Sequence, residues 1–92
     1  MKLIQHDIVM QDGTTLKYHR PYRLENKTHT TIDIVVGSFY SLGEATGASV
    51  PGATSYYTVS STDEIFVVSD SFFEYLLTTD RFAGGQIIQV NV

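Results

Sequence analysis

The most regular alternation of apolar and polar side chains runs from Thr30 to Leu42. Successive side chains of an extended strand point to opposite faces, so this pattern predicts a strand with one buried and one polar face. A strand of this length would measure about 40 Å at about 3.3 Å per residue, which favours a place in the middle of a sheet, with a bend at Gly37. The predicted buried face carries Ile32, Ile34, Val36, Tyr40 and Leu42.

Two further strands are predicted nearer the N-terminus, from Lys2 to Gln11 and from Thr14 to Glu25. The Asp12-Gly13 pair between them is a strong hairpin signal, because glycine readily adopts the left-handed backbone conformation that tight turns need. We expect a three-residue turn that Gly13 closes, with a bulge.

The register of this hairpin follows from the turn. A three-residue turn sets Ile8 opposite Leu16 and His6 opposite Tyr18, which gathers apolar side chains on one face. A two-residue turn would set Ile8 opposite Lys17 and mix the faces, so the first register is predicted.

Pro21 interrupts the second strand of the hairpin. Proline has no N–H to donate to a neighbouring strand, so the strand must be bulged at Arg20-Pro21 or lie at the rim of the sheet there. The polar residues 26–28 then connect to the strand at 30–42, and the three strands form an antiparallel meander.

The segment from Gly43 to Ala53 reads GEATGASVPGA and predicts a loop. Such small residues cannot bury enough apolar surface to fold by themselves, so we expect this loop to be mobile in a monomer and to order against a neighbouring subunit. Glu44, Val50 and Pro51 are its predicted contact residues. A phosphate-binding loop is disfavoured because no lysine follows the glycines.

Three more strands are predicted in the second half of the chain. They are a short run from Thr54 to Ser60, an apolar run from Glu64 to Val68, and a last strand from Gln86 to Val92. The run at Glu64–Val68 is also compatible with an extended lead into the helix that follows it.

The only predicted helix runs from Ser71 to Thr78. Ser71 and Glu74 have the spacing of a capping box, and Asp70 places favourable negative charge at the helix start. Its apolar stripe against the sheet consists of two pairs at i, i+4 spacing: Phe72 with Leu76, and Phe73 with Leu77.

Together these elements predict a single α+β domain over residues 1–92. About five antiparallel strands form the sheet, mainly as a meander. One helix in the C-terminal half packs on it.

Composition narrows the range of functions. The formal net charge is −4 and the pI is about 5.1, which disfavours a general affinity for nucleic acid. Eight serines and eleven threonines supply a neutral, hydroxyl-rich surface that suits assembly, although β-sheets favour threonine in any case. There is no cysteine, no apolar run as long as a membrane helix and no signal-peptide pattern, so we expect no disulfide and no membrane partner.

Catalytic chemistry is not indicated. The three histidines, His6, His19 and His29, lack metal-ligand spacing on any single element. The chain shows no nucleophile elbow, no carboxylate pair with a supporting histidine and no nucleotide fingerprint. We therefore expect no enzyme activity, no metal and no cofactor.

Residues 17–23, KYHRPYR, hold three of the six basic residues, interleaved with aromatic ones. Such a mixture can stack on bases and bind phosphates. Alternation, however, sends Arg20 and the tyrosines to one face and Lys17 and Arg23 to the other. Nucleic-acid binding is therefore disfavoured relative to a strand that faces a partner.

The C-terminal third, SDSFFEYLLTTDRFAGGQIIQVNV, resembles small proteins encoded in the structural gene clusters of tailed bacteriophages. In those proteins an aromatic helix is followed by a Leu-Leu or Leu-Lys segment, a Phe-Ala-Gly turn and a final strand. Gly85 and the long loop GEATGASVPGA depart from that pattern. The matching residues are Phe72, Tyr75, Leu76, Leu77, Phe82, Ala83 and Gly84.

The resemblance implies a virion component, made in the host cytoplasm, that acts as a repeated subunit at a tail, baseplate or head surface. Its expected partners are copies of itself and other virion proteins. One alternative is a small phage protein that binds and inhibits a host defence protein, and another is a carbohydrate-contacting module that uses Tyr18, Tyr22, Tyr56 or Tyr57. The predicted partner interface comprises Glu44, Val50, Pro51, Tyr56, Tyr57, Arg20, Tyr22 and Arg23.

Overall fold

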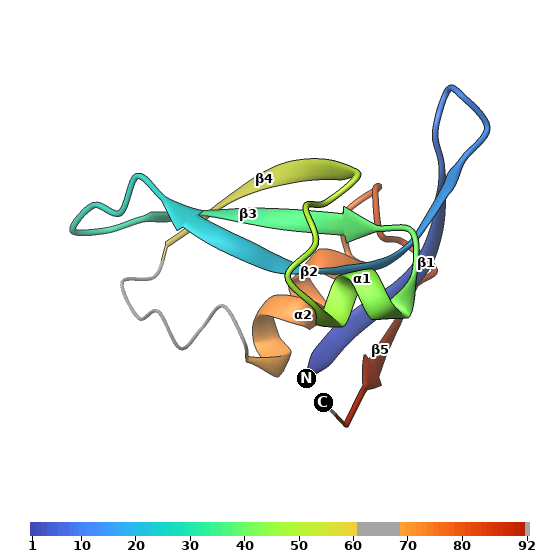
Figure 1. The fold of residues 1–92 in the computed structure, drawn as a ribbon. Coiled ribbons are helices and arrows are strands. Elements are labelled where there is room, and N and C mark those ends of the chain that lie inside the picture. The colour runs from blue at the N-terminus through green and yellow to red at the C-terminus, as the bar shows by residue number, and fades with distance from the viewer. Residues whose placement is uncertain (61–68, 92) are drawn as a thin grey trace.

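The computed structural model describes residues 1–60 and 69–91, which form an antiparallel five-stranded sheet and two short helices (Figure 1). The strand order is β4-β3-β2-β1-β5. The predicted α+β class, mainly antiparallel sheet, is confirmed, but the number of helices is two and not one. The elements are β1 Lys2–Val9, β2 Thr15–Glu25, β3 Ile32–Phe39, α1 Leu42–Thr46, β4 Ala53–Val59, α2 Asp70–Leu77 and β5 Gln86–Gln89.

The turn between β1 and β2 is the predicted one. Gly13 has a φ of 89°, and the Met10 N–H donates to the Thr14 carbonyl at 2.7 Å. Ile8 lies opposite Leu16, as the three-residue turn requires. The hairpin extends well beyond the rest of the fold (Figure 1).

Further along the same hairpin the predicted register is wrong. Tyr18 lies opposite Gln5 and not opposite His6, because the register shifts between Gln5 and Ile8. A bulge inserts an extra residue into one strand, so the alternation of faces does not continue through it.

A second irregularity in β2 falls between Pro21 and Arg23, one residue later than predicted. It moves neighbouring side chains to opposite faces of the sheet. Tyr22 packs beside Phe39, whereas Leu24 packs in the core under α2. Strict alternation from Thr14 to Glu25 predicts Tyr22 and Leu24 on one face, and the bulge is the reason that this prediction is wrong.

The strand β3 is shorter than the predicted strand at 30–42 and lies next to the edge strand β4, not in the middle of the sheet. Ile34 and Val36 belong to the core under α2, while Phe39 belongs to a second core with Ala45 of α1. Residues of even and odd number point to opposite faces, so α1 and α2 cover opposite sides of the sheet. We call the side with Ile34 and Val36 the closed face, and the side with Val35 and Phe39 the open face.

Four of the five residues of α1, Gly43 to Thr46, lie in the segment predicted to be a mobile loop. The fifth, Leu42, is predicted on the buried face of the strand but begins the helix and is exposed. Ser41 caps it: the Ser41 hydroxyl accepts the Glu44 N–H at 3.2 Å and donates to the Glu44 carboxylate at 3.3 Å. Ala45 of this helix is fully buried. The serine cap and the buried alanine explain why the segment forms a helix.

The rest of that segment packs back on its own sheet. The Gly52 N–H donates to the Ser38 carbonyl at 2.9 Å, and a Cβ at Gly37 would lie 3.0 Å from the Pro51 ring. A Cβ at Gly52 would lie 2.8 Å from both Leu16 and Tyr40. The contacts that order residues 43–53 therefore come from the same chain, contrary to the prediction that a neighbouring subunit supplies them.

The helix α2 begins and ends one residue earlier than the predicted helix at 71–78. Its N-cap is Ser69 and not Ser71. The Ser69 hydroxyl accepts the Phe72 N–H at 3.3 Å. The predicted apolar stripe faces the sheet, with Leu77 at its margin. The buried core of the closed face comprises Ile4, Ile32, Ile34, Val36, Phe72, Phe73, Leu76 and Phe82.

The strand β5 ends at Gln89, earlier than the predicted strand at 86–92, and pairs with β1. Met1 and Val90 continue that pairing, since the Met1 ammonium donates to the Val90 carbonyl at 2.7 Å and the Val90 N–H donates to the Met1 carbonyl at 2.8 Å. The predicted strand at 64–68 lies outside the described residues. Of the helices at residues 1–60 and 69–91, none has the length and apolar character to cross a membrane.

Candidate interaction surface

The open face carries a row of three side chains across β2, β3 and β4. Arg23 and Tyr56 both lie opposite Val35 in the register of the sheet. Opposed residues of antiparallel strands share a face, so these three side chains are neighbours. Val35 is buried, whereas Tyr56 is 59% exposed. We call this row, Arg23 with Val35 and Tyr56, the Arg23–Tyr56 platform.

Arg23 is held in place by its neighbours. Its Nε donates to Glu25 Oε1 at 2.7 Å, and its guanidinium carbon lies 5.8 Å from the centroid of the Tyr22 ring. The hydrogen bond to Glu25, with a smaller contribution from Tyr56, raises the pKa of Arg23. The platform therefore presents an oriented cation beside an exposed aromatic ring.

A polar cluster adjoins the platform in the next row of the sheet. Asp33 accepts hydrogen bonds from the Thr58 hydroxyl at 2.6 Å and from the Asn26 side-chain amide at 3.0 Å. These hydrogen bonds, the one from Thr58 first, lower the pKa of the Asp33 carboxyl. Asn26 has a positive φ of 49°, which a turn residue of this type tolerates.

Arg20, one of the predicted interface residues, makes several contacts within the chain. Its Nε donates to the Ala45 carbonyl at 2.6 Å and its Nη1 donates to the Pro21 carbonyl at 3.1 Å. Its guanidinium carbon lies 5.0 Å from the Phe39 ring centroid and 5.9 Å from that of Tyr22. Arg20 thus fastens α1 to the open face through hydrogen bonds and cation–π contacts.

The three residues predicted on the loop occupy three different environments. Glu44 is half-buried, and its carboxylate accepts a hydrogen bond from the Ser41 hydroxyl. Pro51 is half-buried against Gly37 of β3. Only Val50, which is 79% exposed, presents most of its side chain to solvent.

The two neighbouring tyrosines of β4 point to opposite faces. Tyr57 lies opposite Ile34 on the closed face, with its ring centroid 6.2 Å from that of Tyr75 and 6.2 Å from that of Phe82. It is therefore separated from Tyr56, which lies on the open face. The structure brings together Tyr22, Arg23 and Tyr56 of the predicted interface but places Tyr57 elsewhere.

One segment of chain is rich in exposed apolar and aromatic side chains. Seven large hydrophobic residues among those described are exposed, and four of them lie between residues 40 and 56. Scattered exposed hydrophobic residues are common on soluble proteins, and interaction surfaces are distinguished by contiguous apolar patches. The four are Tyr40 at 42%, Leu42 at 37%, Val50 at 79% and Tyr56 at 59% exposure.

A buried pair formed by His19 and Ser38 is not indicated by any sequence pattern. His19 Nε2 lies 2.7 Å from the His6 carbonyl oxygen, and Nδ1 lies 2.8 Å from Ser38 Oγ. A carbonyl only accepts, so Nε2 carries the hydrogen, and Nδ1 accepts from the Ser38 hydroxyl. Burial lowers the pKa of His19 to about 4. Both residues have no exposed surface, so this serine–histidine pair joins three strands and is closed to a substrate.

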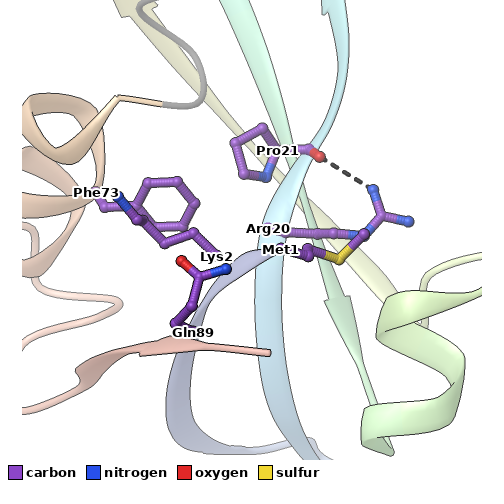
Figure 2. Close-up of a pocket in the computed structure, with 6 residues that line it drawn as sticks. All are labelled: Met1, Lys2, Arg20, Pro21, Phe73 and Gln89. Atoms are coloured by element: carbon purple, nitrogen blue, oxygen red, sulfur yellow. Dashed lines mark hydrogen bonds between the residues drawn. The ribbon is translucent and has the colours of Figure 1, made fainter. Parts of the chain in front are cut away.

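A pocket of about 530 Å³ opens at the end of the sheet between α2 and the start of β1 (Figure 2). The guanidinium of Arg20 is turned toward the Pro21 carbonyl, and Lys2 forms an ion pair with Asp70. Both side-chain cations of the lining therefore already have protein partners. The lining residues are Met1, Lys2, Arg20, Pro21, Phe73 and Gln89.

Comparisons with known proteins do not identify a family for this chain. No family model, no curated protein and no solved structure matches the chain. Within residues 1–60 and 69–91, no group of three or more His, Cys, Asp or Glu side chains is placed to hold a metal ion. The surface features of the open face are therefore the basis for a functional proposal.

Proposed function

We propose that this protein is a small structural subunit of a tailed-phage particle that assembles with copies of itself and with other virion proteins. The observation that carries the proposal is the concentration of exposed apolar side chains between Tyr40 and Tyr56. The resemblance of the C-terminal third to small proteins of phage structural gene clusters supports the virion setting.

The contact surface is expected to be rigid before assembly. The capping of α1 by Ser41 and the hydrogen bond from Arg20 to Ala45 hold the backbone at Leu42. The hydrogen bond from Gly52 to Ser38 holds the backbone that follows Val50. A surface that is ordered in advance loses less conformational entropy when a partner binds. This suits a subunit that must make the same contact many times.

Sedimentation velocity of the purified chain tests the assembly role. We expect the parent to sediment as a multimer and the double variant Leu42→Asp, Val50→Asp to sediment as a smaller species than the parent. Aspartate at position 42 is compatible with the first turn of α1 and Val50 is mostly exposed, so the double variant should fold. The matched control is Val9→Asp on the hairpin, where Val9 is 70% exposed, and this variant should assemble like the parent.

A parent chain that stays monomeric at every concentration would contradict the self-assembly proposal. A monomer that forms a one-to-one complex with a purified host defence protein would favour the alternative of an inhibitor. For the virion setting, mass spectrometry of purified phage particles should find the chain in many copies per particle.

A further inference from the structure

The two edges of the sheet differ in length. At one edge β5 extends over only the four residues Gln86–Gln89. At the other edge β4 extends over the seven residues Ala53–Val59 and pairs with β3 on its inner side. No strand among residues 1–60 and 69–91 pairs with the outer side of β4. The outer backbone groups of β4 are thus positioned to pair with an additional strand.

The strand β4 also lacks the features that usually prevent edge pairing. Natural edge strands are protected by charged side chains, prolines, bulges or short length. The sequence ATSYYTV contains no charge and no proline. Its register with β3 is regular from Ala53 to Val59, whereas the β1–β2 and β2–β3 pairs each contain a shift. An unprotected regular edge of this length favours a role in binding.

We propose that β4 pairs antiparallel with β4 of a second copy, about a two-fold axis that passes beside Tyr56. This inference rests on the proposed assembly role and names the contact. An uncharged strand meets its own copy without repulsion between like charges, and a two-fold contact is self-complementary. Setting Tyr56 opposite Tyr56 pairs all seven residues of the strand.

This register also gives favourable pairs of side chains. Thr54 of each copy lies opposite Thr58 of the other, and the two Tyr56 rings form a cross-strand aromatic pair. Residues of even number then meet residues of even number, so both open faces lie on the same side of one continuous sheet of ten strands. The two Arg23–Tyr56 platforms would join into one surface across the axis.

A disulfide trap tests the register directly, because the chain contains no cysteine. Opposed residues have Cα atoms about 4.5–5.5 Å apart, within the range of about 4.4–6.8 Å that a disulfide bridges. At a concentration where the parent assembles, mild oxidation of the variant Tyr56→Cys should convert most of that variant to a covalent dimer. Thr54→Cys alone should remain uncrosslinked, since it lies about 13 Å from its own copy. The double variant Thr54→Cys, Thr58→Cys should crosslink.

A charge exchange provides an independent test in solution. Tyr56→Lys places two like charges opposite each other and should shift the β4-dependent dimer to monomer, as should Tyr56→Glu. An equimolar mixture of the two variants should restore the dimer. Val9→Lys, which introduces the same charge at another exposed position, should leave the dimer intact.

The outcomes separate the edge inference from the assembly role. If the parent assembles but Tyr56→Cys does not crosslink and Tyr56→Lys still assembles, the edge inference is wrong and the assembly role stands. If the parent is monomeric and no cysteine variant crosslinks, both the edge inference and the assembly of the chain with its own copies are wrong. If Tyr56→Lys abolishes binding of a different virion protein but the parent never self-pairs, β4 binds a foreign strand and the self-pairing inference is overturned.

Discussion

The two faces of the sheet differ in how they are covered. On the closed face, α2 buries Phe72, Phe73 and Leu76 against the strands, together with Phe82 from the following turn. On the open face, the five-residue α1 contributes only Ala45 to the buried core, and Arg20 fastens it. We infer that the closed face supplies most of the folding free energy and that the open face is available for contacts with partners.

The largest predicted effect is on the closed face. Phe73→Ala or Leu76→Ala should lower the free energy of unfolding by about 2–5 kcal/mol, because each leaves a cavity between α2 and the sheet. Urea denaturation followed by circular dichroism measures the loss. If both variants had the same urea midpoint as the parent, the packing of α2 on the sheet would not stabilise the fold.

The next effect concerns His19, which joins strands beneath the closed face. Burial lowers its folded-state pKa from 6.5 to about 4. As the pH falls below 6.5, the unfolded chain binds a proton at His19 that the folded chain does not. The free energy of unfolding should therefore fall by about 3 kcal/mol from pH 7 to pH 4 and then level off for this group.

Urea titrations at several pH values measure this loss. The variant His19→Asn should be less stable at pH 7 but should show a flatter profile between pH 6.5 and pH 4. The carboxyls of Asp12 and Asp33, whose pKa values are lowered by hydrogen bonds, should lose their contribution only below their ordinary pKa of 3.8. Parallel profiles for parent and variant would contradict the assignment to His19.

A smaller effect is expected where α1 is fastened to the open face. Arg20→Met removes the hydrogen bond to Ala45 but retains an apolar stem, and it should lower the free energy of unfolding by about 1–2 kcal/mol. Amide hydrogen exchange within α1 should become faster while α2 stays protected. Arg23→Met is the matched control, and unchanged exchange of α1 in Arg20→Met would show that other contacts hold the helix.

The smallest effect is predicted on the Arg23–Tyr56 platform. Tyr56→Ser should change the free energy of unfolding of the monomer by no more than about 0.5 kcal/mol, because the side chain is 59% exposed. The same urea experiment, at a concentration where the chain is monomeric, provides the value. A loss as large as that of Phe73→Ala would mean that the open face is also part of the stabilising core.

The sequence predicted the elements with strong local signals. Asp12-Gly13 specified the turn and the first pairs of the hairpin, and the spacing of Phe72 to Leu77 specified the buried side of α2. It does not indicate α1, because Gly43 and Gly47 are typical of a loop. The cap that Ser41 provides, three residues before Glu44, was the signal that could have identified the helix.

What the sequence could not provide were the two irregularities in pairing. Each bulge moves the side chains beyond it to the other face. Pro21 marks the one in β2 to within a residue, but no local pattern marks the shift between Gln5 and Ile8. Leu24 therefore changed face, and the neighbours of His19 could not be predicted. The contact between His19 and Ser38 depends on the register of β2 with β3, which only the tertiary structure shows.

The hydrogen bonds between Met1 and Val90 have a consequence for engineering this chain. They place both ends of the described fold together beside β1 and β5, at the edge of the sheet opposite β4 (Figure 1). A short peptide could therefore join the two ends, and new ends could be opened at the tip of the β1–β2 hairpin to give a circular permutant. Fluorescent proteins or affinity tags attached at either original end would extend away from β4, so one fusion design can report on copies of the chain without obstructing that edge.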